Sequence, residues 1–406
     1  MKWEKVKLGD IATFSNGINF NKTAYAKGIK LIGVSNFGDR FYPDYSQLQE
    51  VKKDIVRLED CLRNGDIVFV RSNGNKELVG RCMLVKNPTE RVTYSGFCIR
   101  ARLNDTDRYD PVYFTYYFKS KAFRRAVSGT AVGANIQNLS QARLSNHECR
   151  IPSIEVQHRI ADILSVYDDL IENNQKQIKL LEEAAQRLYK EWFVDLRFPG
   201  YENTKIVDGV PEGWRVASIA DICDTVGGGT PSTKIQSYYE KGDILWVTPT
   251  DITRNFSLAL LDTEKKITPE GLKNSSAKML PAETILMTSR ASVGFFGMCK
   301  YEVCTNQGFI SCIPKRENLQ MYLLFNLKSR VEEIRQKAGG STYLEISKTV
   351  FRELKIILPK DEVLAEYQKN VHDIFDEIYC RTEMIKSLVD MRNRVLPKLM
   401  SGEVEV

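Results

Sequence analysis

The sequence from Gln157 to Phe193 reads QHRIADILSVYDDLIENNQKQIKLLEEAAQRLYKEWF and contains neither glycine nor proline. Its apolar side chains recur mostly three or four positions apart, at Ile160, Ile163, Tyr167, Leu170, Leu181, Leu188 and Trp192. That spacing predicts one face of a long α-helix. At 1.5 Å per residue the helix would be roughly 50 Å long, which is too long for the interior of one small domain.

The same pattern returns near the C-terminus, 207 positions further along the chain. The matched pairs are Ile171 with Ile378, Ile178 with Ile385, Leu181 with Leu388, and Leu188 with Val395. Two such helices can pack antiparallel as a coiled coil within one chain, whereas a coiled coil between two chains is the alternative. Polar residues interrupt both stripes, and we expect them to fix the helix register: Asn174, Gln177 and Arg381.

The segments that precede the two helices also resemble each other. Each begins with a tryptophan, at Trp3 and Trp214, and each then has a glycine turn, a short apolar run, an aromatic-rich helix and a glycine-centred loop. The pattern predicts two α/β (α+β) globules in tandem, each followed by a long helix. The expected boundaries are 1–150 for the first globule, 151–194 for its helix, 195–213 for a linker, 214–355 for the second globule and 356–406 for the last helix.

The composition of the 406 residues, with 43% hydrophobic and 27% charged, is typical of a globular protein. The chain shows no basic-then-apolar leader and no run of 18 apolar residues, so we expect neither export nor membrane insertion. Nine cysteines lack paired spacing, and the closest group, Cys299, Cys304 and Cys312, has no nearby histidine. We therefore expect no zinc site. We expect the cysteines to be reduced thiols, as in a cytoplasmic protein.

Charge is distributed unevenly between the segments. Residues 1–150 hold 25 basic and 15 acidic side chains, a net charge of +10, whereas residues 151–213 hold 7 and 12, a net charge of −5. A basic globule suits a phosphate backbone, and an acidic helix does not. The distribution favours a nucleic-acid partner for the globules.

Catalytic motifs are sparse. The segment Gly227 to Lys234 superficially resembles a phosphate-binding loop, but its lysine follows threonine rather than glycine. The three histidines, His147, His158 and His372, form no metal-like pair, and no acidic pair typical of a nuclease follows a predicted strand. We expect no catalysis by this chain alone, and a self-contained enzyme acting on DNA is the alternative.

Polar and basic side chains follow a buried strand in each globule. Residues 71–76 contain arginine, serine, asparagine and lysine, and residues 289–292 contain serine and arginine. Arginine can donate to guanine O6 and N7, and asparagine can pair with adenine. Serine, threonine and backbone amides more often hold phosphates. Two similar globules with dissimilar loops favour two binding modules of different specificity.

Several segments together resemble the specificity subunit of type I restriction-modification enzymes. They are Trp3–Ala12, Trp214–Ile222, the Pro-Glu-Gly-Trp at 211–214, Glu191–Phe198, and Ile151-Pro152 followed by Gln157–Ile163. The resemblance covers essentially the whole chain. It implies two target-recognition domains that each read one half of a bipartite DNA site, with the helices acting as a spacer and as a docking surface for two methyltransferase subunits. Restriction subunits would bind the resulting complex.

The resemblance also implies where cofactors and DNA contacts belong. S-adenosylmethionine would bind the methyltransferase, and ATP with Mg²⁺ the nuclease-motor subunit, with no cofactor in this chain. The resemblance implies a cytoplasmic protein of a bacterium or archaeon. Together with the positions of the loops, the resemblance predicts these DNA-binding residues: Ser35, Arg71, Asn73, Lys76, Asn135, Thr230, Lys234, Thr250, Ser289, Arg290 and Ser341. A methylation-only or phage-defence subunit without a nuclease partner, and a coiled-coil scaffold that binds only protein, are the alternatives.

Overall fold

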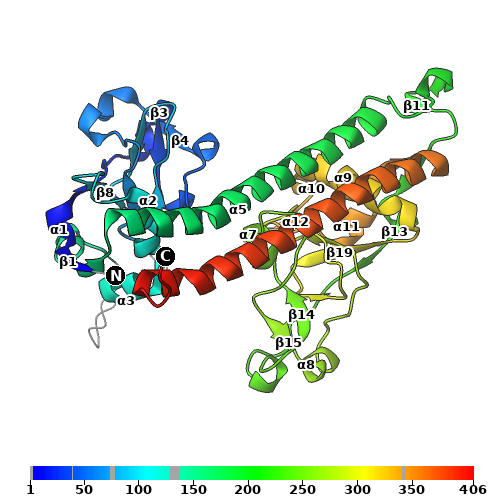
Figure 1. The fold of residues 1–406 in the computed structure, drawn as a ribbon. Helices are drawn as coiled ribbons and strands as arrows, with labels where there is room; N and C mark the ends of the chain where they lie inside the picture. The colour runs from blue at the N-terminus through cyan, green and yellow to red at the C-terminus, as the bar shows by residue number, and fades with distance from the viewer. Residues whose placement is uncertain (1–2, 39, 74–77, 129–137, 341–342) are drawn as a thin grey trace. The chain divides into compact units, whose positions relative to one another are not determined.

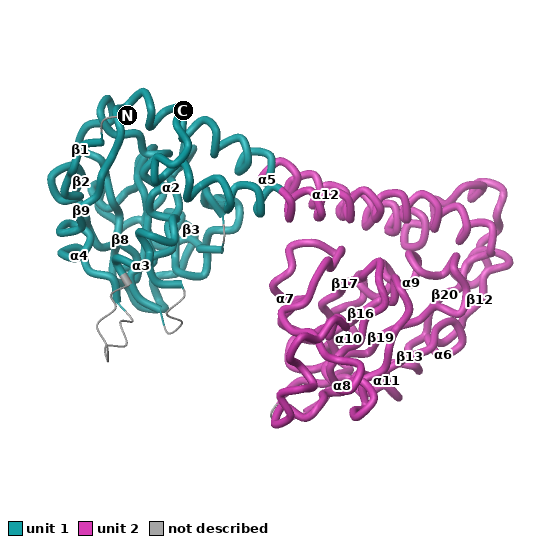
Figure 2. Tube along the Cα trace, turned by 60° about the horizontal axis from the view of Figure 1, so that its bottom comes forward, with its two compact units in different colours: residues 1–171, 388–406 teal, residues 172–387 magenta. Residues whose placement is uncertain are grey.

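The computed structural model describes residues 3–38, 40–73, 78–128, 138–340 and 343–406. The chain divides into two compact units (Figure 2). Unit 1 comprises residues 1–171 with 388–406, and unit 2 comprises residues 172–387. Each unit therefore holds one globule together with a segment of both long helices.

Unit 1 contains two sheets and a terminal strand pair (Figure 1). The four-stranded sheet has the order β2-β8-β5-β6 and is antiparallel, and the three-stranded sheet has the order β4-β3-β7, in which β3 and β7 are parallel. Strand β1 pairs with β9. The elements are β1 (Glu4–Lys7), α1 (Leu8–Ile11), β2 (Ala12–Asn16), β3 (Tyr25–Ile32), β4 (Gln49–Val51), β5 (Ile67–Val70), β6 (Cys82–Leu84), β7 (Val92–Tyr94), β8 (Cys98–Leu103), α2 (Pro111–Lys119), α3 (Lys121–Ser128), α4 (Gln141–Ser145), β9 (Glu148–Ile151) and the first half of α5 (Ile154–Tyr189).

Unit 2 repeats this topology and has in addition the antiparallel pair β10-β11. Its sheets have the orders β13-β19-β16-β17 and β15-β14-β18, with β14 and β18 parallel, and β12 pairs with β20. The predicted tandem duplication is thereby confirmed. The elements are β10 (Ile206–Val207), β11 (Val210–Pro211), β12 (Arg215–Ser218), α6 (Ile219–Ile222), β13 (Cys223–Val226), β14 (Ile244–Val247), α7 (Pro249–Arg254), β15 (Lys266–Ile267), α8 (Pro269–Lys273), β16 (Ile285–Thr288), β17 (Phe296–Gly297), β18 (Cys304–Thr305), β19 (Phe309–Pro314), α9 (Gln320–Ser329), α10 (Val331–Gln336), α11 (Lys348–Arg352), β20 (Lys355–Leu358) and most of α12 (Asp361–Ser401).

The core of unit 1 joins the globule to both long helices. Aromatic side chains of α2, such as Phe114 and Phe118, are fully buried in one cluster with Phe69 of β5. Leu164 of α5 and Leu399 of α12 belong to the same cluster. Burying each such side chain contributes roughly 1.5–3 kcal/mol, so the helix segments are part of the hydrophobic core of this unit.

The long helices pair antiparallel inside each unit, as predicted. In unit 2, Tyr367 Oη donates to the carbonyl oxygen of Ala185, while further along α12 Arg381 donates to Asn174 at 3.1 Å. Arg381 is the repeat counterpart of Asn174, so a polar side chain of one helix meets its own equivalent in the other. In unit 1, Arg392 of α12 pairs with Asp168 of α5.

The predicted stripe on α5 is wrong in part. Ile160 and Trp192 are buried, but Ile163 and Leu170 are exposed. The positions that pack inside the units also include Leu164, Ile171, Ile178, Ala185 and Tyr189. The helix carries apolar residues on more than one face, and spacing alone cannot tell which face packs within the chain.

One glycine in the glycine turn of each globule is required by close packing. A Cβ on Gly17 would lie 2.2 Å from the carbonyl oxygen of Tyr94, and one on Gly228 would lie 2.1 Å from that of Thr305. Real Cβ atoms do not approach oxygen so closely. Gly228 is therefore held tightly against the strand exit that follows β18.

All nine cysteines are free, and eight of them are buried. Burial raises the pKa of the Cys82 thiol to about 11 and that of Cys98 to about 12. Within the residues that the structure describes, no helix combines the length and the apolar character needed to cross a membrane.

Candidate nucleic-acid interface

Loops that are distant in the sequence are hydrogen-bonded to one another at one edge of the unit 1 sheets. The backbone N–H of Arg71, directly after β5, donates to the carbonyl oxygen of Phe97 at 2.8 Å. That of Ile18, after β2, donates to Tyr94 at 2.9 Å, and that of Leu139 donates to Arg71 at 2.8 Å. These bonds form a backbone frame at the exits of β2, β5 and β7.

Unit 2 builds the same frame with different side chains. The N–H of Ser289, directly after β16, donates to Gly308 at 2.8 Å, and that of Ile346 donates to Ser289 at 3.1 Å. Ser289 therefore occupies the place of Arg71, and Arg290 that of Ser72. Successive side chains of an extended segment point to opposite faces, so the arginine of each unit is presented differently.

The structure places two of the predicted unit 1 residues on this frame. Arg71 is half-buried, and its guanidinium donates to the carbonyl oxygen of Gly96 at 3.1 Å, which orients the side chain. Asn73 is half-buried two positions further on. Ser35 is exposed at the exit of β3, whose parallel partner β7 leads into the same edge. Lys76 and Asn135 lie outside the described residues.

The predicted unit 2 residues differ in exposure. Arg290 is exposed, and its Nε lies 3.6 Å from the carboxylate of Glu345. Such an exposed pair contributes about 1 kcal/mol at most, so the guanidinium can exchange this partner for a phosphate or a base. Ser289 is buried, which leaves its backbone rather than its hydroxyl as the functional part. Thr230, Lys234 and Thr250 are exposed, and Ser341 lies outside the described residues.

Further polar groups at the unit 2 frame were not predicted from the sequence. Thr230 donates its hydroxyl to the side-chain oxygen of Gln307, an exposed amide of the kind that pairs with adenine. Lys348 packs closely against Gly227, because its ammonium nitrogen lies 2.7 Å from the position that a Cβ would take on that glycine. Gln307 follows a two-residue strand and Lys348 begins a five-residue helix, and neither element has a strong local signal.

Each histidine has protein partners. His147 forms a hydrogen bond with Tyr117 Oη at 2.7 Å, and burial lowers the pKa of its imidazole. His372 lies between two carboxylates, with Nε2 3.1 Å from Glu283 and Nδ1 3.5 Å from Asp376. Because the carboxylates face different ring nitrogens and Lys300 pairs with Asp376 at 2.7 Å, this is a hydrogen-bonded network rather than a preformed metal site.

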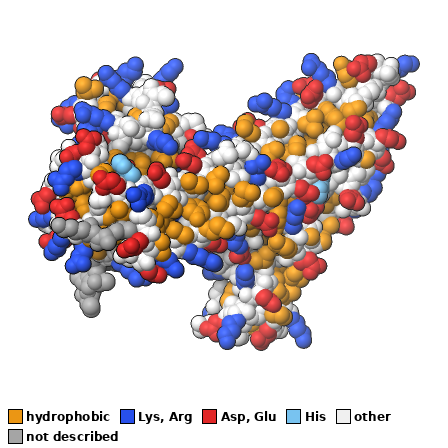
Figure 3. Space-filling model, in the orientation of Figure 1, with side chains coloured by type: hydrophobic (Ala, Val, Ile, Leu, Met, Phe, Trp, Pro, Cys, Tyr) orange, Lys and Arg blue, Asp and Glu red, His pale blue; other side chains and the backbone are white. Residues whose placement is uncertain are grey.

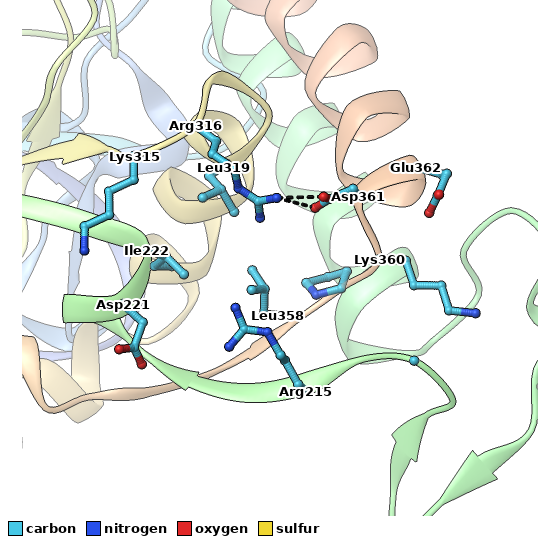
Figure 4. A pocket seen from close by; sticks show the side chains of 12 residues that line it. Arg215, Asp221, Ile222, Lys315, Arg316, Leu319, Leu358, Lys360, Asp361 and Glu362 are labelled. Carbon is cyan, nitrogen blue, oxygen red and sulfur yellow. Dashed lines mark hydrogen bonds and ion pairs between the residues drawn. The ribbon is translucent and has the colours of Figure 1, made fainter.

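A pocket of about 580 Å³ in unit 2 is a poorer candidate for a DNA contact. Arg316 lines this pocket and donates to both carboxylate oxygens of Asp361, at 2.6 and 2.7 Å (Figure 4). Hydrogen bonds from Ser218, with the nearby charge of Arg215, hold the pKa of Asp221 below its usual range. The lining combines four basic with three acidic side chains, so it does not present one sign of charge to a phosphate backbone.

A separate apolar surface lies on α5 in unit 1. Ile163, Val166 and Leu170 are exposed and are spaced three and four positions apart, so they share one face of the helix. Figure 3 shows hydrophobic side chains gathered along the long helices. The repeat counterparts in α12 are polar or acidic: Asn370, Asp373 and Glu377. We call Ile163, Val166 and Leu170 the α5 patch, and it fits a protein partner better than DNA.

Comparison with known proteins adds three findings. A family model described as the type I restriction modification DNA specificity domain matches residues 1–183 and again 211–389. The chain is 25% identical to the specificity subunit of the type I restriction enzyme HindI of Haemophilus influenzae, with 99% of both chains covered. It is 38% identical to the MjaIX specificity subunit of Methanocaldococcus jannaschii over 42% of this chain and 39% of that one.

The fold is also similar to a solved structure. The S subunit of a type I restriction-modification system from M. genitalium superposes with a TM-score of 0.57 at 17% identity, covering 98% of this chain and 96% of that one.

Proposed function

This chain belongs to the type I restriction-modification DNA specificity family, and from that membership we propose that it selects the DNA sequence on which a methyltransferase acts. Each globule reads one half of a bipartite site. The observation that carries this proposal is the backbone frame that the two globules share, on which they display different side chains. A common scaffold with different loops is the arrangement expected of two recognition modules with different targets.

The exposed and half-buried polar residues of the frame are the proposed DNA contacts. In unit 1 they are Ser35, Arg71 and Asn73, and in unit 2 they are Thr230, Lys234, Thr250 and Arg290. The arginines suit guanine edges or phosphates, and the hydroxyls suit phosphates. Gln307 and Lys348 extend the unit 2 contact surface.

The chain recognises DNA without catalysing a reaction, and its partners supply the chemistry. Two methyltransferase subunits dock on the helical segments and bring S-adenosylmethionine, and restriction subunits bring ATP and Mg²⁺. The α5–α12 pair sets the gap between the two half-sites. Because the chain would act with DNA and these partners, we expect it to function in the cytoplasm of a prokaryotic cell. The α5 patch supports the docking part of this proposal, because exposed contiguous apolar side chains mark protein interaction sites.

Sequencing of methylated DNA tests the proposal directly. A host that expresses this chain with its methyltransferase should carry methylated adenines in one split motif with a fixed gap, because the chain supplies the sequence recognition. A host with the methyltransferase alone should lack the motif. If the complex assembles and no chain-dependent motif appears, the recognition proposal fails, and a protein scaffold becomes the better account of the helices.

A further inference from the structure

The most exposed aromatic ring beside each frame is Phe97 in unit 1 and Tyr343 in unit 2, whereas Phe295 near the exit of β16 is 41% exposed. Phe97 is 63% exposed in the turn between β7 and β8, and Tyr343 is 59% exposed between Gly339 and Glu345. A single exposed apolar side chain is ordinary on a protein surface. These two differ from an ordinary case in where they lie and in how firmly their backbones are held.

The backbone of Phe97 is fixed from two sides. Its carbonyl oxygen accepts from the N–H of Arg71 at 2.8 Å and from that of Ser72 at 3.3 Å. The preceding Gly96 is pressed against Asn19, since a Cβ there would lie 2.0 Å from the Asn19 Oδ1. The turn is therefore rigid while its ring faces solvent beside Arg71.

Tyr343 is fixed by a different loop. Gly339 and Glu345, on either side of it in the sequence, exchange two backbone hydrogen bonds of 3.0 and 2.8 Å. Glu345 forms an isolated β-bridge with Arg290, and the N–H of Ala291 donates to the carbonyl oxygen of Leu344 at 2.8 Å. The ring is thus tied to the exit of β16, beside the arginine of the second frame.

The two rings do not come from equivalent positions. The counterpart of Phe97 in the shared frame is Gly308, which has no side chain. Each globule therefore reaches the same arrangement, an exposed ring next to an arginine at the exit of the central strand, by its own loop. This recurrence by different routes is what a common physical task at the two half-sites would produce.

We propose that Phe97 and Tyr343 are base-stacking wedges, one for each half of the DNA site, an inference that rests on the recognition function proposed above. Each ring packs against or between bases while the neighbouring arginine contacts a phosphate or a base edge. Apolar and aromatic side chains that enter the base stack partly unstack one step. An adenine that must leave the duplex to be methylated then leaves it more easily when the wedge has loosened its neighbour.

Duplex DNA fits these rings better than a protein partner does. Protein interfaces bury contiguous patches, such as the one formed on α5 by Ile163, Val166 and Leu170. Phe97 and Tyr343 each stand next to an arginine rather than within such a patch. Leu344, next to Tyr343, is less exposed at 38%. A protruding ring with a cationic neighbour matches the alternation of bases and phosphates along a strand.

The test uses the complex of this chain with its methyltransferase and duplexes that carry its methylated motif, with 2-aminopurine beside the methylated adenine of either half. The fluorescence of 2-aminopurine rises when its neighbours unstack. Phe97→Ala should suppress this rise in one half-site only and slow methylation there roughly 10- to 100-fold, the range expected for loss of one stacked base. Tyr343→Ala should do the same in the other half-site.

Matched variants control for folding and for general surface effects. Phe97→Tyr and Tyr343→Phe retain a ring and should preserve both readouts. Tyr25→Ala and Phe256→Ala remove rings that are 45% and 49% exposed away from the frames, and they should change neither readout. Tyr25 begins β3 at the end opposite to the frame.

The possible outcomes distinguish failure of the wedge inference from failure of the proposed recognition function. If Phe97→Ala and Tyr343→Ala match the unsubstituted complex while that complex still prefers its motif, the wedges are wrong and the recognition function stands. If the unsubstituted complex shows no preference for any motif, both fail. If either variant instead loses methyltransferase subunits, the ring is a protein contact and the wedge proposal is overturned.

Discussion

Substituting aspartate at both Val166 and Leu170 is expected to reduce the number of methyltransferase subunits bound per chain from two to one. Val166 is 56% exposed, so the change itself costs the fold little. A docked partner would bury two carboxylates without counter-ions, at a cost of several kcal/mol. A loss of about 4 kcal/mol corresponds to nearly a 1,000-fold weaker complex.

Only one subunit should be lost because the repeat does not duplicate the α5 patch. The α12 counterparts of Val166 and Leu170 are Asp373 and Glu377, so a second methyltransferase docked there would meet a charged surface in the unsubstituted chain as well. Native mass spectrometry of the purified complex measures the ratio. Leu58→Asp, at an exposed apolar residue of the unit 1 globule, is the matched control and should keep two subunits. Retention of two subunits by the double variant would contradict docking at the α5 patch.

Arg392→Ala is expected to have the largest effect on the stability of unit 1. Its guanidinium pairs with Asp168, which is 5% exposed and also accepts a hydrogen bond from Tyr116 Oη at 2.6 Å. Burial and the adjacent carboxylate raise the pKa of Tyr116, so the phenol remains a neutral donor and cannot replace the lost positive charge. Removing one partner of a buried ion pair typically costs about 3–5 kcal/mol.

Urea denaturation followed by circular dichroism measures this loss. The double variant Asp168→Leu with Arg392→Met replaces both charges by apolar groups and should recover part of the stability, because no uncompensated charge remains although the buried Tyr116 hydroxyl loses its acceptor. Equal stability of Arg392→Ala and the unsubstituted chain would show that the pair does not hold α12 to the globule.

The architecture was largely predictable because helix spacing and repeat order are local properties of the sequence. The long helices, their antiparallel pairing and the duplicated globules follow from the matches between Ile171 and Ile378 and between Trp3 and Trp214. The phase of the α5 stripe was not predictable. Ile163 and Leu170 fit the helical spacing as well as Leu164 does, and only tertiary packing decides which of them is buried.

The site was predictable as a set of loops but not as a set of side chains. Arg71 and Arg290 were expected at strand exits, where the structure places them. The hydrogen bonds that fix those exits join residues far apart in sequence, such as Leu139 with Arg71 and Ile346 with Ser289. A local pattern cannot specify such bonds, so neither the burial of Ser289 nor the exposure of the Phe97 ring could be foreseen.

Independent reading of one half of the DNA site by each globule is the core of the proposed function. Its most direct test replaces residues 214–355 with the corresponding domain of another specificity subunit and maps methylated adenines genome-wide in cells that also contain the methyltransferase. We expect one half of the split motif to change while the other half and the gap remain, because the first globule and the helices are untouched. A change in both halves, or in neither, would contradict it.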